Sequence, residues 1–194
     1  MIVHRLVPYI VIGVHVLAYK ELFVQRRLAA ETLPHLHLLA VNALPASVTI
    51  DDDAYAGLNP GDPTGDGGTL GFDRFTTFAD ALAVVAAGGT LRVQPGTYPE
   101  AVVIDRDVTV TGVSGTATDV VIDPPGTSDD GITVSSSVSD VVIEHVSVTG
   151  ACDGIDSAAD GSLTVTNVIS SGNTCDGIHA TGADTVRIER GVLN

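Results

Sequence analysis

The sequence is poor in aromatic and basic residues, and both shortages restrict what the protein can be. Among 194 residues there are four Phe, four Tyr and no Trp. The core must therefore be filled by aliphatic side chains, which suits the narrow interior of a coiled β-structure. Only nine Lys and Arg stand against 24 Asp and Glu, and the formal net charge is −15. This charge would repel phosphates, so nucleic acid is excluded as a partner, and it favours either solubility or cation binding.

Acidic residues are almost missing from the first part of the chain. Residues 1–46 contain four Lys or Arg, two Glu and no Asp, whereas all nineteen Asp lie beyond residue 50. The apolar run from Leu6 to Tyr19 has fourteen residues, too few to span a bilayer comfortably. We expect residues 1–46 to be a leader resembling a secretory signal, no membrane span beyond it, and a secreted or cell-surface protein. A leader arising from an incorrectly chosen start codon is the alternative.

The rest of the chain contains an internal repeat. Cys-Asp-Gly-Ile occurs at residues 152–155 and 175–178, an interval of 23 residues, and Asp-Gly-Ile occurs at 130–132. Short runs of Val, Ile, Leu and Thr recur between these marks. A period in the low twenties, filled by β-favouring residues and Gly/Asp turns, predicts a solenoid whose coils stack to bury their apolar faces.

An amphipathic segment precedes the repeats. Phe75, Phe78, Leu82 and Val85 recur at helical spacing and predict a helix from about Thr76 to Ala87. The first coil of a solenoid would otherwise expose its interior and its unpaired strand edges. We therefore expect this helix to cap the first coil.

The motif that follows the helix carries a family resemblance. Gly-Thr at residues 89–90 leads into Pro-Gly-Thr-Tyr-Pro-Glu at 95–100, after Phe-Thr-Thr-Phe-Ala-Asp-Ala-Leu at 75–82. This order resembles the opening of secreted right-handed parallel β-helix proteins of the pectin-lyase-like superfamily, over about residues 48–194. It implies an all-β, right-handed parallel β-helix with a helical N-terminal cap over residues 47–194. The family includes lyases, esterases and adhesins, so the resemblance predicts fold better than function.

Residues 23 apart should stack at the strand spacing of roughly 4.8 Å, which gives the first candidate sites. Asp130, Asp153 and Asp176 would form a column of mutually repelling carboxylates, which a cation such as calcium would stabilise. Ordinary turn chemistry of Asp before Gly is the alternative. Cys152 and Cys175 would lie within disulfide range, and a stacked pair of reduced thiols is the alternative there.

Polar residues in other stacks give further binding candidates. Asp156 and His179 would lie side by side, but spacing places no Ser or Cys nucleophile beside them. Surface hydrogen bonding is therefore the expected role, with an acid–base pair as the alternative. His145, Asn167 and Arg190 also align and predict a polar strip suited to an acidic or neutral polysaccharide, although any solvated solenoid face presents such a strip.

One loop partly matches a calcium-binding pattern. Asp62-Pro63-Thr64-Gly65-Asp66-Gly67 places oxygen side chains at alternate positions before a Gly, with Asp73 twelfth in the series. An EF-hand loop ends in Glu and follows a helix, and neither condition is met here.

Together these features predict an exported or cell-surface module with a non-catalytic polysaccharide-binding or surface-display role. The alternatives are an N-terminal fragment of a polysaccharide lyase, hydrolase or esterase, and a purely structural or assembly solenoid. For an enzyme of this family, the resemblance implies catalytic acids and Arg in later coils than these. The sequence ends at Asn194, soon after the strand expected at 186–188, with no C-terminal cap between them. We therefore expect either a truncated chain or an open end that pairs with another chain.

Overall fold

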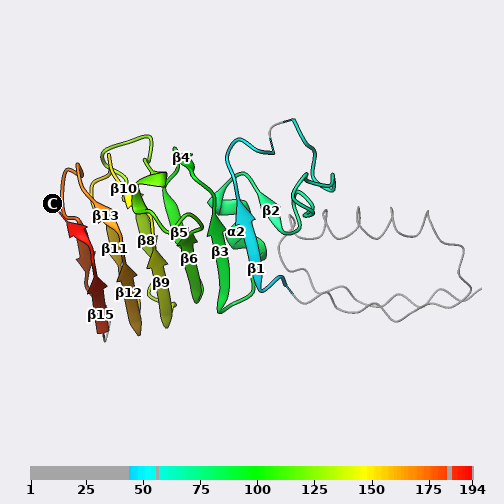
Figure 1. The fold of residues 1–194 in the computed structure, drawn as a ribbon. Coiled ribbons are helices and arrows are strands. Elements are labelled where there is room, and N and C mark those ends of the chain that lie inside the picture. The colour runs from blue at the N-terminus through cyan, green and yellow to red at the C-terminus, as the bar shows by residue number, and fades with distance from the viewer. Residues whose placement is uncertain (1–43, 56, 183–184, 194) are drawn as a thin grey trace, which may run out of the picture. The chain divides into compact units, whose positions relative to one another are not determined.

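The repeats form the strands of three parallel sheets (Figure 1). The computed structural model describes residues 44–55, 57–182 and 185–193. Every pairing between its named strands is parallel. Figure 1 shows successive coils stacked along one axis, in chain order from β1 to β15. The predicted all-β, parallel β-helix is confirmed.

Three sheets make up the faces of the solenoid. The largest has the order β15-β12-β9-β6-β3-β1-β2, with bounds Thr185–Glu189, Ser162–Thr166, Asp140–Glu144, Val108–Gly112, Gly89–Val93, Ser47–Ile50 and Arg74–Phe75. The second has the order β16-β13-β10-β7-β4, with bounds Val192–Leu193, Ile169–Ser170, Ser147–Val148, Val120–Ile122 and Gly96–Tyr98. The third has the order β14-β11-β8-β5, with bounds Ile178–Ala180, Ile155–Ser157, Ile132–Val134 and Val102–Ile104.

The register of the sheets follows the repeat, with one local change. Ile132 pairs with Ile155 and Ile155 with Ile178, which keeps the interval of 23. In the largest sheet Asp140 pairs with Ser162, an interval of 22, and Ser162 pairs with Thr185, an interval of 23. The turn between β8 and β9 therefore contains one residue more than the turn between β11 and β12.

Aliphatic ladders fill the interior, as the shortage of aromatic residues predicts. In the largest sheet, paired positions place Leu91, Val110, Ile143 and Val165 in one inward row. None of these four side chains is more than 1% exposed. Burying each such side chain contributes about 1.5–3 kcal/mol relative to leaving it in water.

A helix lies at the first coil, although it is shorter than predicted. Helix α2 spans Phe78–Val84 rather than the expected 76–87. Thr77 is its N-cap and accepts a hydrogen bond from the backbone N–H of Asp80, while Val85 has extended backbone and ends the helix. The helix therefore begins two residues later than the apolar spacing suggested, because Thr77 caps it by accepting from one of its free N–H groups.

The motif at residues 95–100 holds this helix in place. The ring of Tyr98 is fully buried and packs edge-on against Phe78, with 5.3 Å between the ring centroids. The Tyr98 hydroxyl donates to the carbonyl of Gln94 at 2.8 Å. The Glu100 carboxylate accepts from the backbone N–H of Phe78 at 3.0 Å. Tyr98 and Glu100 therefore act in the fold, where they join the first coil to its cap.

The leader expected over residues 1–46 lies outside the described residues, apart from its last three positions. The carbonyls of Pro45 and Ala46 accept hydrogen bonds from the backbone N–H groups of Ala86 and Thr90. Within the described part of the chain, no helix has the length and apolar character needed to cross a membrane.

Candidate functional site

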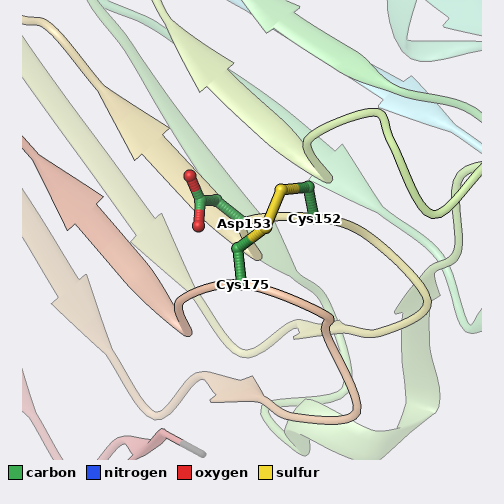
Figure 2. A group of neighbouring side chains, drawn as sticks. All are labelled: Cys152, Asp153 and Cys175. Atoms are coloured by element: carbon green, nitrogen blue, oxygen red, sulfur yellow. A yellow bond between two sulfur atoms is a disulfide. The ribbon is translucent and has the colours of Figure 1, made fainter.

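A disulfide joins two neighbouring turns of the third sheet, those that lead into β11 and β14. Cys152 and Cys175 are bonded, and their Cα atoms lie 4.8 Å apart. The backbone N–H of Cys175 also donates to the carbonyl of Cys152 at 2.9 Å. Figure 2 shows the bond crossing from one turn to the next, with the Asp153 side chain beside it. The bond fixes the segment that carries the Asp column.

The Asp column is a ladder of hydrogen bonds between coils. A carboxylate oxygen of Asp130 accepts from the backbone N–H of Asp153 at 3.2 Å, and Asp153 in turn accepts from that of Asp176 at 2.7 Å. These N–H groups stabilise the charged carboxylates, so the column has a structural explanation that needs no cation. Among the described residues, two clusters of possible metal ligands within 4.8 Å of one another contain Asp153. No such cluster contains Asp130 or Asp176.

The structure instead combines Asp153 with the pair Asp156 and His179. Asp156 of β11 pairs with His179 of β14, and His179 Nδ1 lies 2.9 Å from Asp156 Oδ1 and 3.8 Å from Asp153 Oδ2. Their side chains are 48%, 29% and 16% exposed for His179, Asp156 and Asp153. The hydrogen bond to Asp156, and then the charges of Asp156, Asp153 and Asp176, raise the pKa of His179. We call Asp153, Asp156 and His179 the Asp–His cluster.

Sequence reasoning treated the members of this cluster as parts of two separate stacks. The missed signal is local: Asp153 and Asp156 lie three residues apart, on either side of Gly154 and Ile155. The chain turns into β11 between them, so both carboxylates lie near the His179 imidazole, which belongs to the next coil.

A buried polar network supports the turns beneath the cluster. The Ser170 hydroxyl is fully buried, donates to the Gly177 carbonyl at 2.7 Å and accepts from the Asn173 amide at 2.9 Å. The side-chain oxygen of Asn173 accepts from the backbone N–H of Ala151 at 3.1 Å. A Cβ on Gly154 would lie 1.7 Å from the Ser170 hydroxyl, so only glycine fits there. These contacts join the turns that precede β11 and β14, which carry Asp153 and lead to Asp156 and His179.

The three residues of the second predicted strip occupy equivalent turns. His145, Asn167 and Arg190 follow β9, β12 and β15, and all have left-handed backbone, with φ of 57°, 50° and 53°. The Asn167 amide donates to the Gly115 carbonyl at 3.1 Å, and Nδ1 of His145 is buried. Backbone geometry therefore explains their alignment, and binding by this strip stays a prediction.

In the acidic loop that partly matches a calcium site, the carboxylates accept hydrogen bonds from groups of the protein itself. Arg74 Nε donates to Asp66 at 2.6 Å, and the Thr64 hydroxyl donates to the same carboxylate. The Thr64 hydroxyl and the Arg74 guanidinium hold the pKa of Asp66 well below its usual 3.8. Asp73 accepts from the backbone N–H of Thr69 at 2.7 Å. An arginine thus takes the place that a cation would have in this loop.

Comparison with known proteins finds no counterpart for this arrangement. No family model matches the chain, and no curated protein or solved structure is significantly similar to it. The structure shows the parallel β-helix fold that the sequence resemblance implies, and membership of the pectin-lyase-like superfamily stays a prediction.

Proposed function

We propose that the protein is an exported or cell-surface β-helix module that binds polysaccharide without cleaving it. The observation that carries this proposal is a row of outward positions on the third sheet. Val103, Thr133, Asp156 and His179 are paired in register across β5, β8, β11 and β14. One position repeated coil after coil suits a ligand that also repeats.

The chemistry of this row favours a neutral polysaccharide over a uronate. Val103 is an exposed apolar side chain, against which the apolar face of a sugar ring can pack. Thr133, Asp156 and His179 offer hydrogen-bond donors and acceptors to hydroxyl groups. The carboxylates of Asp153 and Asp156 would repel the carboxylates of a uronate chain, as would the net charge of −15.

Two features support an oxidising, extracellular location. One is the basic and apolar leader expected at residues 1–46. The other is the disulfide between Cys152 and Cys175, since such bonds persist chiefly outside the cytosol. Fractionation of the producing cells, followed by immunodetection of the protein, would test this location.

Affinity electrophoresis of the full chain would test binding. We expect native gels containing neutral glucans or galactans to retard the protein more than gels containing pectin or alginate. The double variant Asp156→Ala/His179→Ala should lose this retardation, whereas Asp160→Ala, at an exposed acid outside the row, should keep it. Equal migration in all gels would overturn the proposal, and retardation of the double variant would overturn the assignment of the face.

A polysaccharide-cleaving enzyme is the second candidate. It is favoured by the 2.9 Å contact between His179 Nδ1 and Asp156 Oδ1, since an imidazole beside a carboxylate can transfer protons. Incubation with the same polysaccharides, followed by detection of unsaturated or reducing ends, separates the two functions. Release of such ends by the protein, and not by His179→Ala, would reject the non-catalytic function.

A further inference from the structure

We propose that Asp153, Asp156 and His179 form a binding site for a divalent transition-metal ion, with Zn²⁺ the ion of best fit. Two carboxylates and one imidazole each offer a ligand atom, and these atoms all lie within 4.8 Å of one another. The site lies on the outward side of β11 and β14, beside the disulfide. It differs from the Asp130–Asp153–Asp176 column, in which Asp130 and Asp153 each accept from the backbone N–H of the next Asp along.

The distances between the ligand atoms suit a tetrahedral ion. Zinc binds nitrogen and oxygen at about 2.0–2.2 Å, which places its ligand atoms about 3.3–3.6 Å apart. His179 Nδ1 lies 2.9 Å from Asp156 Oδ1 and 3.8 Å from Asp153 Oδ2, on either side of this range. Side-chain shifts of about half an ångström would bring His179 Nδ1 to the tetrahedral separation from each of the two carboxylates. The ligand atoms of Asp153 and Asp156 lie within 4.8 Å of each other and would move closer together around the ion.

The cluster also has the outer contacts that orient metal ligands. The backbone N–H of Asp176 holds Oδ1 of Asp153 at 2.7 Å, and Oδ2 is the oxygen nearer to His179. The disulfide and the buried Ser170 network fix the turns that carry Asp153 and Asp176. Ligands held in this way lose little freedom when the ion binds, and outer contacts of this kind raise affinity.

The donor set favours a transition metal over calcium. Calcium takes about six to eight oxygen ligands, whereas imidazole suits zinc, copper, nickel and iron. An ion held by three protein ligands keeps an open position for water or a ligand oxygen. It would also offset the repulsion between Asp153 and Asp156. Metal binding alone defines the site, so this inference stands apart from polysaccharide binding.

Zinc titration of the metal-free full chain tests the site, with a chromophoric chelator as competitor. We expect His179→Ala and Asp156→Asn to weaken zinc binding at this site at least about tenfold, since even outer contacts are worth about 10–100-fold. Asp160→Asn, which changes an exposed acid outside the cluster, should bind as the unchanged protein does. Calcium should not displace zinc. Circular dichroism would check that each variant keeps its β-structure, and His179→Gln would serve as a second, more conservative variant.

The outcomes separate this site from others in the chain. Residues 1–46 contain four of the six His, and zinc bound by those histidines would be unaffected by His179→Ala and Asp156→Asn. If His179→Ala and Asp156→Asn bind zinc with unchanged affinity and stoichiometry, the ion lies elsewhere and the proposal is overturned. The absence of any zinc binding by the unchanged protein would overturn it equally. Gel retardation measured with chelator present would report on polysaccharide binding separately.

Discussion

The first coils and the last described coil differ in burial, although their sequences follow the same pattern. In one ladder of the largest sheet, Leu91, Val110, Ile143 and Val165 are at most 1% exposed, whereas Ile188 of β15 is 43% exposed. The inner members have a coil on both sides, while among the described strands β15 pairs with β12 alone. Burial in this solenoid therefore depends on the neighbouring coils as well as on the residue itself.

The two regions also use different means of stabilisation. At the first coil, α2 covers the interior, and Phe78 and Tyr98 pack there as fully buried aromatic rings. In the last coils no such rings are available, and the Cys152–Cys175 disulfide links β11 to β14 through the preceding turns. A noncovalent cap thus serves one region, and a covalent link serves the other.

The largest expected effect comes from matched truncations in this ladder. Ile143→Ala creates a cavity between two coils and should lower the free energy of unfolding by about 2–5 kcal/mol. Ile188→Ala removes the same atoms from a half-exposed position and should cost about 1 kcal/mol or less. Urea denaturation of the two variants measures the difference. Equal losses would show that Ile188 is as well buried as Ile143, and would break the comparison.

Removal of the disulfide should have the next largest effect. The bond closes a loop of 23 residues, and loss of this restraint on the unfolded chain should cost about 3 kcal/mol. Cys152→Ala/Cys175→Ala would show it as a lower urea midpoint under oxidising conditions. The unchanged protein under reducing conditions is the control and should resemble the double variant. A double variant as stable as the oxidised protein would show that the last coils do not depend on this link.

The smallest effect is a pH dependence confined to the cap. Burial raises the pKa of Glu100 above its usual 4.5, against the opposing hydrogen bonds from the N–H groups of Phe78 and Ala79. Just above pH 4.5 the folded state therefore binds more protons than the unfolded state at this group. The contribution of Glu100 to the free energy of unfolding therefore falls as the pH rises, by no more than about 1.4 kcal/mol per pH unit.

Glu100→Gln tests this dependence, because the amide oxygen can still accept from Phe78 but does not titrate. We expect the unchanged protein to lose stability relative to the variant as the pH rises from 4.5. Urea midpoints measured over pH 4–7 would show it. Parallel curves for the two proteins would mean that Glu100 titrates alike in both states, and the cap would have no pH dependence of its own.

Much of the fold could be predicted from local patterns. The apolar positions Phe78, Leu82 and Val85, predicted to face the core, are all buried. The repeat placed Ile132, Ile155 and Ile178 in one row, and the register agrees. The helix bounds were wrong because apolar spacing marks a face, while Thr77 and Val85 set where the helix begins and ends.

The sequence by itself determined the period, the parallel coils, the aliphatic core and the pairing of Asp156 with His179, because strand spacing turns a fixed interval into a contact. Only the tertiary structure decided that Asp153 joins this pair, and that His145, Asn167 and Arg190 share a left-handed turn. It also showed that Arg74 holds the acidic loop. The physical reason is that an interval specifies which residues stack, whereas the direction of each side chain depends on the turn beneath it and on the donors within reach.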